Sequence, residues 1–244
     1  MTLLGFVGAG NIARALAVGL GEPALFSDGG SGRAVALADL VGGEAVSNAE
    51  LVRRADVVVL AHKPGQLRAV AAELSGATVV LSLLAGVSLE QLEAALPGAV
   101  LTRGMPNTAV AVRRGVTCVC GAPGLDELLA RVGVVVRLPE RLIDAAVAVS
   151  GVAPAYVSLI AEAWVDAAVG QGIPAAQAAE LVCAGLAGSA ALLEQRGMDT
   201  LAVRREVTSP GGMTARGLRV LERAGLRAAF SDAAAAVVGT GPPK

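Results

Sequence analysis

The segment spanning residues 3–16 places the strongest constraint on what this chain can fold into. It reads Leu-Leu-Gly-Phe-Val-Gly-Ala-Gly-Asn-Ile-Ala-Arg-Ala-Leu, so an apolar run ends at Val7 and G-x-G-x-x-A follows it. Apolar residues then recur at helical spacing. A strand, a glycine turn and a helix in this order are typical of a dinucleotide-binding fingerprint. The alternative is a glycine-rich turn between strand and helix that holds no ligand.

Each small residue of the fingerprint has a predicted role. Gly8 permits a tight turn, Gly10 has no Cβ to keep a pyrophosphate from the backbone, and Ala13 lets the helix pack closely on the strand. The N–H groups and the positive end of the helix are expected to hold the phosphates. The predicted cofactor contacts here are Gly8, Ala9, Gly10, Asn11, Ile12 and Ala13.

Composition argues against several other classes of protein. Hydrophobic residues make up 54% of the 244 residues and aromatic ones 2%, so Ala, Val and Leu must form the core. A formal net charge of −1 gives no electrostatic case for nucleic acid or an anionic membrane. The three cysteines lack metal-ligand spacing, which favours buried thiols in a reducing compartment. The longest uncharged run, 145–161, is shorter than the roughly 20 residues of a membrane span. We therefore predict a cytoplasmic protein without a metal site.

Strand and helix patterns alternate through the first part of the chain. This alternation predicts an α/β fold with a doubly wound, Rossmann-type parallel sheet. After the first strand, we expect further strands at 24–27, 44–46, 56–61, 78–83, 99–103, 116–120 and 134–138. Helices are expected at 33–40, 49–54 (with Asn48 as its cap), 65–74, 89–96 and 126–132.

Strand signals disappear after residue 139, and helices are expected at 142–149, 155–170, 175–194 and 210–224. The predicted domains are therefore 1–140, which binds the dinucleotide, and 141–244, which is helical. Several of these helices are apolar on more than one face. One small domain cannot bury so much apolar helix surface. We predict a homodimer in which the helical domains interlock.

Further cofactor contacts are expected where strands end, because dinucleotides bind at the carboxyl ends of parallel strands. At the end of the second predicted strand, Asp28 would accept hydrogen bonds from the adenosine ribose and disfavour a 2′-phosphate. Ser31 and Arg33 would instead serve that phosphate, so the sequence leaves NADPH and NADH both open. The residues that follow the strands are Ser27, Asp28, Lys63, Pro64, Ala85, Gly86 and Asn107.

One segment of the helical half has the pattern of a ligand-binding loop, Ser209-Pro210-Gly211-Gly212-Met213-Thr214. Free N–H groups at Gly212, Met213 and Thr214 would form an anion cradle at a helix start. The alternative is an ordinary helix start, with Ser209 as cap and Pro210 in the first position. That alternative leaves unexplained two successive glycines, which weaken a helix by about 1 kcal/mol each relative to Ala. A carboxylate-binding loop is therefore favoured.

Taken together, these segments resemble the pyrroline-5-carboxylate reductase family over nearly the whole chain. The most specific motif is Ser-Pro-Gly-Gly-x-Thr, in a helical domain that follows a Rossmann half. The other matching segments are 5–13, Lys63-Pro64, 85–87, 105–108, 150–156 and 166–169. The resemblance implies hydride transfer from NADPH or NADH to the imine carbon of 1-pyrroline-5-carboxylate. The product is L-proline, in the last step of proline biosynthesis.

The resemblance also implies roles for individual residues. Beside the fingerprint, the cofactor would be lined by Ser27, Asn48, Ala61, Lys63 and Ala85. The substrate would be held by Ser209, Gly212, Met213 and Thr214, with the Thr214 hydroxyl bonded to the ring nitrogen. Family members are dimers through the helical domain, often assembled further into rings. The chain departs from the family pattern at Asp28, Met213 and Val152-Ala153.

Two other functions stay open. A related β-hydroxyacid or imine reductase would have the same two-part layout, but a catalytic lysine would then be expected in the helical half. The only lysine there is Lys244. A non-catalytic NAD(P)-binding sensor dimer would not oxidise NAD(P)H when pyrroline-5-carboxylate is supplied.

Overall fold

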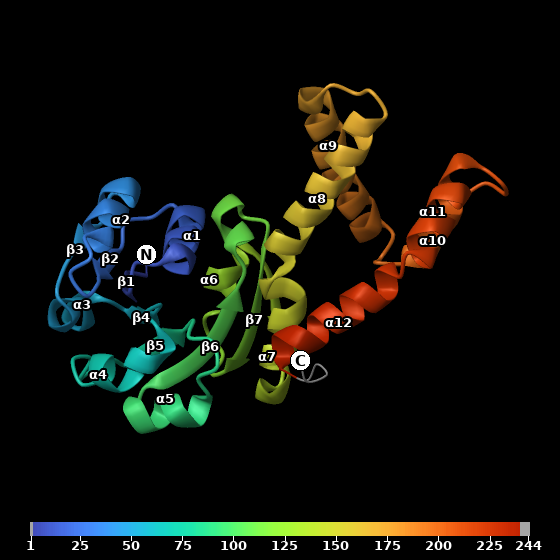
Figure 1. Cartoon of the computed structure of the whole chain (residues 1–244). Helices are drawn as coiled ribbons and strands as arrows, with labels where there is room; N and C mark the ends of the chain where they lie inside the picture. Colours follow the sequence, from blue (N-terminus) through green and yellow to red (C-terminus); the bar gives the residue numbers. More distant parts are fainter. Residues whose placement is uncertain (1, 240–244) are drawn as a thin grey trace. The chain divides into compact units, whose positions relative to one another are not determined.

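The computed structural model describes residues 2–239, and the chain divides into two compact units, Met1–Pro154 and Ala155–Lys244. The first unit is built on an eight-stranded sheet of order β3-β2-β1-β4-β5-β6-β7-β8 (Figure 1). β1 lies between β2 and β4, so the direction in which the strand order progresses reverses there. The strands are β1 (Leu4–Val7), β2 (Leu25–Ser27), β3 (Glu44–Ala45), β4 (Val57–Leu60), β5 (Val79–Ser82), β6 (Val100–Pro106), β7 (Gly115–Gly121) and β8 (Gly133–Arg137).

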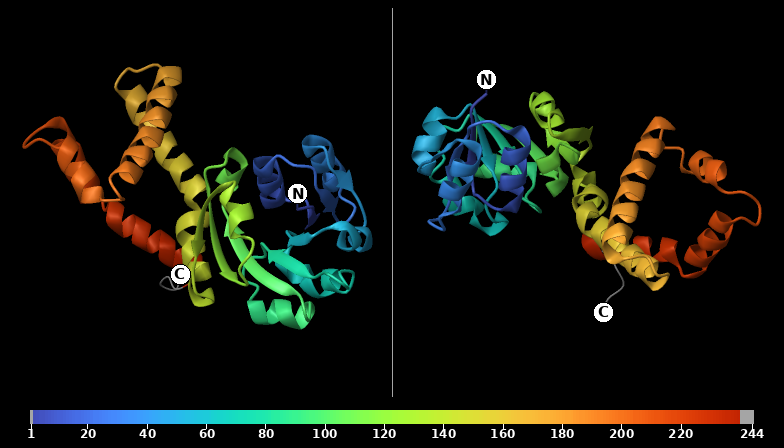
Figure 2. Two further views of the ribbon diagram at one scale, coloured as in Figure 1. Left: turned by 180° about the vertical axis from the view of Figure 1, so that it is seen from behind. Right: turned by 90° about the horizontal axis from the view of Figure 1, so that it is seen from above.

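Helices cover both faces of this sheet, as Figures 1 and 2 show. One core layer joins Phe6 and Val59 to α1 (Asn11–Leu20), α2 (Arg33–Val41) and α6 (Asp126–Ala130). The opposite layer joins Val7 and Leu60 to α3 (Asn48–Arg54), α4 (Leu67–Ala71) and α5 (Leu89–Ala95). Successive strand residues point to opposite faces, so every residue of β1 and β4 is buried. This burial on both faces explains the continuous apolar runs in the sequence.

The predicted Rossmann-type sheet is confirmed, with one difference in strand direction. β7 pairs with β6 antiparallel and with β8 parallel, so β7 and β8 run against the other six strands. Only residues 107–114 separate β6 from β7, and they contain the short turn η2 (Thr108–Val112). A parallel crossover needs a dozen or more residues, so this connection is too short for one.

The segment after β8 packs back onto the sheet. Ile143 of α7 (Ile143–Ala146) is buried with Cys118 and Cys120 of β7. Glu140, in the short turn η3 (Glu140–Leu142), accepts hydrogen bonds from the backbone N–H of Leu89 at 2.7 Å and from the buried Arg103 at 2.8 Å. Burial alone raises the pKa of Glu140, but these two hydrogen bonds and the Arg103 charge outweigh it, so the pKa lies below its ordinary value. The compact first unit thus continues beyond the compositional change near residue 140.

A π-helical turn, η4 (Val147–Gly151), follows α7 and is held by Asn107 at the carboxyl end of β6. The Asn107 side-chain amide donates to the carbonyl oxygen of Ser150 at 3.0 Å and accepts from the N–H of Val116 at 3.3 Å. The amide is therefore engaged inside the first unit. One N–H of the amide group is left over for a further acceptor.

The second unit is helical throughout its described part. It contains most of α8 (Ala153–Gly170), then α9 (Ala175–Gln195), α10 (Thr200–Val207), α11 (Met213–Arg223) and α12 (Leu226–Val238). α10 and α12 were not predicted from the sequence pattern. α10 begins at a side-chain cap, because Asp199 accepts hydrogen bonds from the N–H groups of Leu201 and Ala202.

Large apolar side chains are exposed along these helices in the single chain. Leu159 is 66% exposed, Trp164 54% and Leu181 61%. The stretches Glu140–Gly170 and Ala175–Gln195 are also long and apolar enough to cross a membrane, by length and composition alone, and only 11% of either window is buried. An interlocking partner subunit, as the sequence predicts, would cover the same apolar surface.

Candidate functional site

The fingerprint turn joins β1 to α1 at the point where the strand order reverses, and Gly8 is indispensable to it. Gly8 has φ +105°, and an added Cβ would lie 2.6 Å from the carbonyl carbon and oxygen of Ala61. The Gly8 N–H donates to the Ser27 carbonyl at 2.8 Å, and the Ala61 N–H donates to that of Val7 at 2.8 Å. The ends of β1, β2 and β4 are thereby fastened together, and only glycine fits between them.

Gly10 is required for a different reason. It is the N-cap of α1 with an extended backbone, and an added Cβ would approach only the Ala61 oxygen, at 4.0 Å. The space above Gly10 is thus open at the start of a ten-residue helix, whose first N–H groups have no partner within the helix. Ala13 is fully buried. A backbone open at a helix N-terminus fits the pyrophosphate of a dinucleotide.

A hollow of about 470 Å³ lies beside this turn. Part of its wall is the fingerprint itself, at Ala9, Gly10 and Asn11. Arg14 of α1 and Arg33 of α2 complete the polar part of the wall. Arg33 was singled out from the sequence, whereas Arg14 was not. The signal that could have found Arg14 is a basic residue in the first turn of the fingerprint helix, where the helix dipole disfavours a positive charge.

Ser27 and Asn48 come together at the end of β2. The Ser27 hydroxyl donates to the Asn48 side-chain oxygen at 2.5 Å, and the Asn48 amide donates to Glu73 at 2.8 Å. The expected capping role of Asn48 is wrong, because Ser47 caps α3 by accepting from the N–H of Glu50. Ser47, one residue earlier, provides the N-terminal cap, so the Asn48 side chain is left to contact Ser27.

Asp28 is occupied within its own loop. Its carboxylate accepts hydrogen bonds from the N–H of Gly30 at 2.9 Å, the Ser31 hydroxyl at 2.7 Å and the N–H of Ala34 at 3.0 Å. The Ser31 hydrogen bond, followed by those from backbone N–H groups, holds the pKa of Asp28 below its ordinary value despite partial burial. Asp28 is thus ionised at neutral pH and braces the start of α2.

Lys63 and Pro64 follow β4 in an exposed turn. The Lys63 carbonyl lies 2.9 Å from Nδ1 of His62, so a neutral His62 carries its proton there. Burial lowers the pKa of His62, and the hydrogen bond to Lys63 only partly offsets this. The short turn η1 (Pro64–Gln66) and α4 replace the single helix predicted at 65–74.

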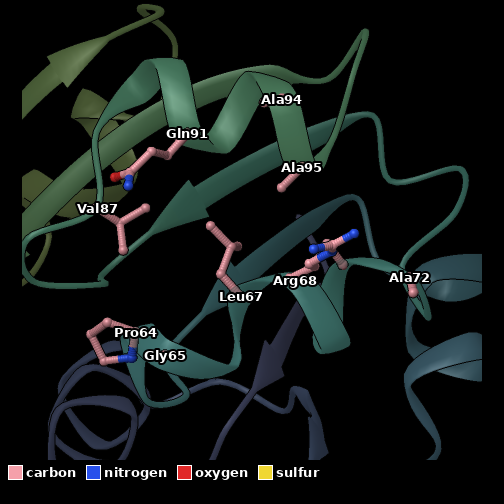
Figure 3. A pocket seen from close by; sticks show the side chains of 10 residues that line it. Pro64, Gly65, Leu67, Arg68, Ala72, Val87, Gln91, Ala94 and Ala95 are labelled. Carbon is pink, nitrogen blue, oxygen red and sulfur yellow. The ribbon is translucent and has the colours of Figure 1, made fainter.

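A second hollow, of about 610 Å³, lies between α4 and α5 (Figure 3). Pro64 is the only predicted cofactor contact that lines it. Its polar lining comes from Arg68 and Gln91, and the Gln91 side-chain oxygen already accepts from the N–H of Ser88 at 2.9 Å. Ala85 and Gly86, in the turn after β5, are exposed, and Gly86 has φ +70°. The structure does not join this hollow to the fingerprint.

The glycine pair of the second unit forms a turn immediately before α11. Gly211 has φ +69°, and a Cβ on Gly212 would overlap the Ser209 hydroxyl. Glycine is therefore favoured at residue 211 by its backbone conformation and at residue 212 by the lack of space for a Cβ. The prediction that the Gly212 N–H is free to bind an anion is wrong, because this N–H donates to the Ser209 carbonyl at 3.0 Å.

α11 begins at Met213, with Gly212 as its N-cap, so the helix starts later than the predicted residue 210. The Pro210 position falls in the turn instead. The N–H groups of Met213 and Thr214 lie in the first helical turn, where N–H groups have no partner within the helix. The Met213 side chain is 83% exposed, so it does not obstruct its own N–H. The turn thus keeps two of the three predicted donors.

Comparison with known proteins decides the family. Residues 140–240 match the family model for pyrroline-5-carboxylate reductase dimerisation, and residues 3–86 match that for NADP oxidoreductase, coenzyme F420-dependent. A pyrroline-5-carboxylate reductase of Corynebacterium melassecola is 34% identical, and the alignment covers 97% of this chain and 96% of the relative. The chain belongs to the pyrroline-5-carboxylate reductase family.

Solved structures of the family agree over the full length. The pyrroline-5-carboxylate reductase of Coxiella burnetii has a TM-score of 0.86 at 29% identity and covers 99% of each chain. The Plasmodium falciparum pyrroline carboxylate reductase, solved with NADP bound, has a TM-score of 0.85 at 26% identity and covers 98% of this chain and 96% of that one. These matches confirm the predicted family and enzyme class, an oxidoreductase that uses NAD(P)H. The match at 140–240 also identifies that region as the family's dimerisation domain.

Within residues 2–239, no group of three or more His, Cys, Asp and Glu side chains is arranged to hold a metal ion. Each unit, described by itself, contains its own set of backbone donors and hydroxyl groups. The first unit holds the fingerprint turn and the Ser27–Asn48 contact. The second unit holds the turn at Ser209–Thr214.

Proposed function

We propose that this chain reduces the cyclic imine 1-pyrroline-5-carboxylate to L-proline, with NAD(P)H as the reductant. The observation that carries the proposal is the turn before α11 in a member of this family. There Ser209 precedes two helix N–H groups, of Met213 and Thr214, that have no acceptor among the residues that the structure describes. A small anionic substrate without a bulky polar group matches such a turn. The family match in both halves of the chain supports the pairing of this turn with a dinucleotide site.

The cofactor site in this proposal is the fingerprint turn. The pyrophosphate lies over Gly10 at the N-terminus of α1, and the adenosine end extends toward the loop after β2. Ser27 and Asn48 stand on that side, already bonded to each other. The nicotinamide end extends toward the strand ends at Lys63, Ala85 and Asn107. NADP in the Plasmodium falciparum relative supports a nicotinamide dinucleotide as the cofactor.

The substrate carboxylate is held in this proposal by the Ser209 hydroxyl and the N–H groups of Met213 and Thr214. An anion at this place also interacts favourably with the positive end of α11, an eleven-residue helix. The Thr214 hydroxyl is the remaining polar group of the turn, and it bonds the ring nitrogen. These contacts fix the ring without any charged side chain.

The chemistry requires little of the protein beyond alignment. When bound, the reduced nicotinamide supplies a hydride to the imine carbon, while the ring nitrogen gains a proton and becomes an amine. Holding the nicotinamide and the imine in the correct relative orientation lowers the activation barrier of hydride transfer by several kcal/mol. A strong general base is unnecessary, because the reaction consumes a proton and removes none from carbon. The Thr214 hydroxyl positions the nitrogen for that proton.

Assembly and location follow from the same proposal. The dimerisation domain at 140–240 forms a homodimer, which covers the exposed apolar side chains of α8 and α9. Further assembly into a ring and a cytoplasmic location are expectations carried from the family and the sequence. Sedimentation of the purified chain measures whether it assembles into a ring.

The activity is tested with purified protein, NADPH or NADH, and 1-pyrroline-5-carboxylate. We expect the nicotinamide absorbance to fall only when the imine is present and proline to accumulate in equal amount. Binding of either nucleotide without any turnover would instead support the non-catalytic sensor. Turnover of open-chain imines or β-keto acids in preference to the cyclic imine would support the related reductase.

A further inference from the structure

The hydrogen bond between Ser27 and Asn48 continues to a third residue, Glu73. Ser27 ends β2, Asn48 begins α3, and Glu73 lies in the turn that follows α4 (Figure 1). The Ser27 hydroxyl donates to the Asn48 side-chain oxygen at 2.5 Å, and the Asn48 amide nitrogen donates to the Glu73 carboxylate at 2.8 Å. The Glu73 N–H donates to the Val70 carbonyl at 2.9 Å, which holds the turn. One chain of hydrogen bonds therefore joins three elements beside the fingerprint.

Glu73 decides which way the Asn48 amide faces. A carboxylate accepts hydrogen bonds and donates none, so the amide atom that faces Glu73 is the nitrogen. The amide oxygen then faces Ser27, whose hydroxyl has a single proton to donate. That proton goes to Asn48, because the other acceptor near the hydroxyl among residues 2–239, the Phe6 carbonyl, lies farther away at 3.4 Å. The direction of both hydrogen bonds thus depends on the acid at the exposed end of the chain.

One N–H of the Asn48 amide is left for a ligand. Ser27 is 3% exposed and supports the amide oxygen from the buried side, whereas Asn48 is half-buried and Glu73 is exposed. An amide nitrogen carries two N–H groups, and among residues 2–239 this one has a single acceptor, Glu73. Because the oxygen and the first N–H are both held, the second N–H points in one fixed direction. The partner that such a donor requires is an oxygen of the ligand.

Two simpler roles for Glu73 predict different results. If Glu73 only ties α3 to the turn after α4, its removal affects folding stability and leaves ligand binding unchanged. If Glu73 acts only through its charge, its removal strengthens the binding of an anionic dinucleotide, because like charges repel. An orienting role predicts a loss of affinity, because the released Asn48 amide can rotate and its N–H no longer faces the ligand.

We infer that Glu73 is a positioning residue of the cofactor site, which holds the Asn48 amide so that its free N–H donates to a ribose oxygen of the adenosine. This oxygen is one that NADPH and NADH share. The inference rests on the proposed binding of a dinucleotide at the fingerprint, whose adenosine end extends toward the loop after β2. Glu73 itself touches no cofactor atom and acts through Asn48 alone.

The test measures dissociation constants by calorimetry for NADPH and NADH, with the wild type, Glu73→Ala and Glu73→Gln. One hydrogen bond to the cofactor is lost in Glu73→Ala, so both nucleotides are expected to bind roughly 3- to 10-fold more weakly. The KM for NADPH should rise by the same factor at unchanged kcat. Glu73→Gln keeps a side-chain oxygen that can accept from Asn48 and should recover most of the affinity. Glu93→Ala is the matched control, because Glu93 is an exposed glutamate of α5, and it should alter none of these values.

A double-mutant cycle tests whether Glu73 acts through Asn48. Asn48→Ala should also weaken both nucleotides roughly 3- to 10-fold, since it removes the same hydrogen bond. Adding Glu73→Ala to Asn48→Ala should then weaken binding by less than about twofold further, because no amide is left to orient. Additive losses in the double variant would overturn the inference.

The remaining outcomes separate this inference from the proposed function. Unchanged binding in Glu73→Ala would make Glu73 a structural residue, and tighter binding would show that it acts by charge; either result overturns the inference. Weaker binding of only one nucleotide would also overturn it, because the ribose oxygen is common to both. A wild type that binds neither nucleotide would refute the proposed function itself.

Discussion

Two alanine substitutions in the fingerprint separate folding from cofactor binding. Gly8 and Gly10 are both replaced by Ala, one at a time. At Gly8 the new Cβ would lie 2.6 Å from the Ala61 carbonyl and the His62 nitrogen, at a φ of +105°. At Gly10 the nearest atom would be 4.0 Å away. Gly8→Ala requires the backbone near Ala61 to move. Gly10→Ala instead fills space that we assign to the pyrophosphate.

The expected costs follow from these geometries. A side chain at positive φ costs about 1–2 kcal/mol, and relieving an overlap in a packed region adds about 1–3 kcal/mol. Gly8→Ala should therefore lower the free energy of unfolding by roughly 2–5 kcal/mol. Each kcal/mol lowers the melting temperature by about 2–4 °C in a chain of this size. Gly10→Ala changes an N-cap and should cost less than about 1 kcal/mol.

The assay combines thermal unfolding, at one fixed protein concentration, with calorimetric binding of NADPH. We expect Gly8→Ala to melt at least about 4 °C below the wild type. Gly10→Ala should melt within about 4 °C of it, yet bind NADPH at least about tenfold more weakly, because its methyl group keeps a phosphate from the backbone. A fixed concentration matters, because dimer dissociation makes the melting temperature concentration-dependent.

Each of the two variants can contradict its own prediction independently of the other. If Gly10→Ala binds NADPH as tightly as the wild type does, the pyrophosphate does not lie over this turn. If Gly8→Ala melts like the wild type, the close approach of β1 and β4 is not what requires glycine.

Three further predictions concern the proposed substrate-binding turn at Ser209–Thr214 and the ion pair between Glu140 and Arg103. Gly212→Ala should displace the Ser209 hydroxyl and raise KM for pyrroline-5-carboxylate about tenfold, with little change in melting temperature; an unaltered KM contradicts that contact. Thr214→Ala should lower kcat about 100-fold at unchanged NADPH affinity, and Thr214→Ser should recover most of it; full turnover of the alanine variant removes Thr214 from the mechanism. Glu140→Gln should cost roughly 2 kcal/mol near neutral pH, less than a fully buried pair because Glu140 is partly exposed. The lowered pKa of Glu140 makes this difference fade as the pH falls below its ordinary value of 4.5, so an equal loss at all pH values refutes the Arg103 pairing.

Much of the first unit could be predicted because its signals are local. Continuous apolar runs marked the strands, and the glycine spacing placed the fingerprint at the first βα turn. The direction of β7 was missed, although the short connection at 107–114 contained the information. In the helical half, α10 was overlooked because its cap at Asp199 precedes a weakly apolar stretch.

The candidate site shows the same division between local and long-range signals. Spacing alone located Ser209–Thr214, but only the turn geometry showed that Gly212 has given its N–H to Ser209. The role of Asp28 also required the structure, since a carboxylate twenty residues after Gly8 is equally compatible with a ribose contact and a loop brace. Which donors reach an acidic side chain depends on the conformation of the loop.

The sequence by itself determined the fold class, the family and the place of the two candidate ligand-binding turns, because these depend on residue types at fixed short spacings. The tertiary structure decided which polar groups are left free to bind a ligand. Asp28, Asn107 and the Gly212 N–H are engaged by neighbours, whereas the side chains of Arg14 and Arg33 have no hydrogen-bond or ion-pair partner among residues 2–239. The physical reason is that a polar group's availability depends on every donor, acceptor and charge that the fold brings near it, and most of these are distant in sequence.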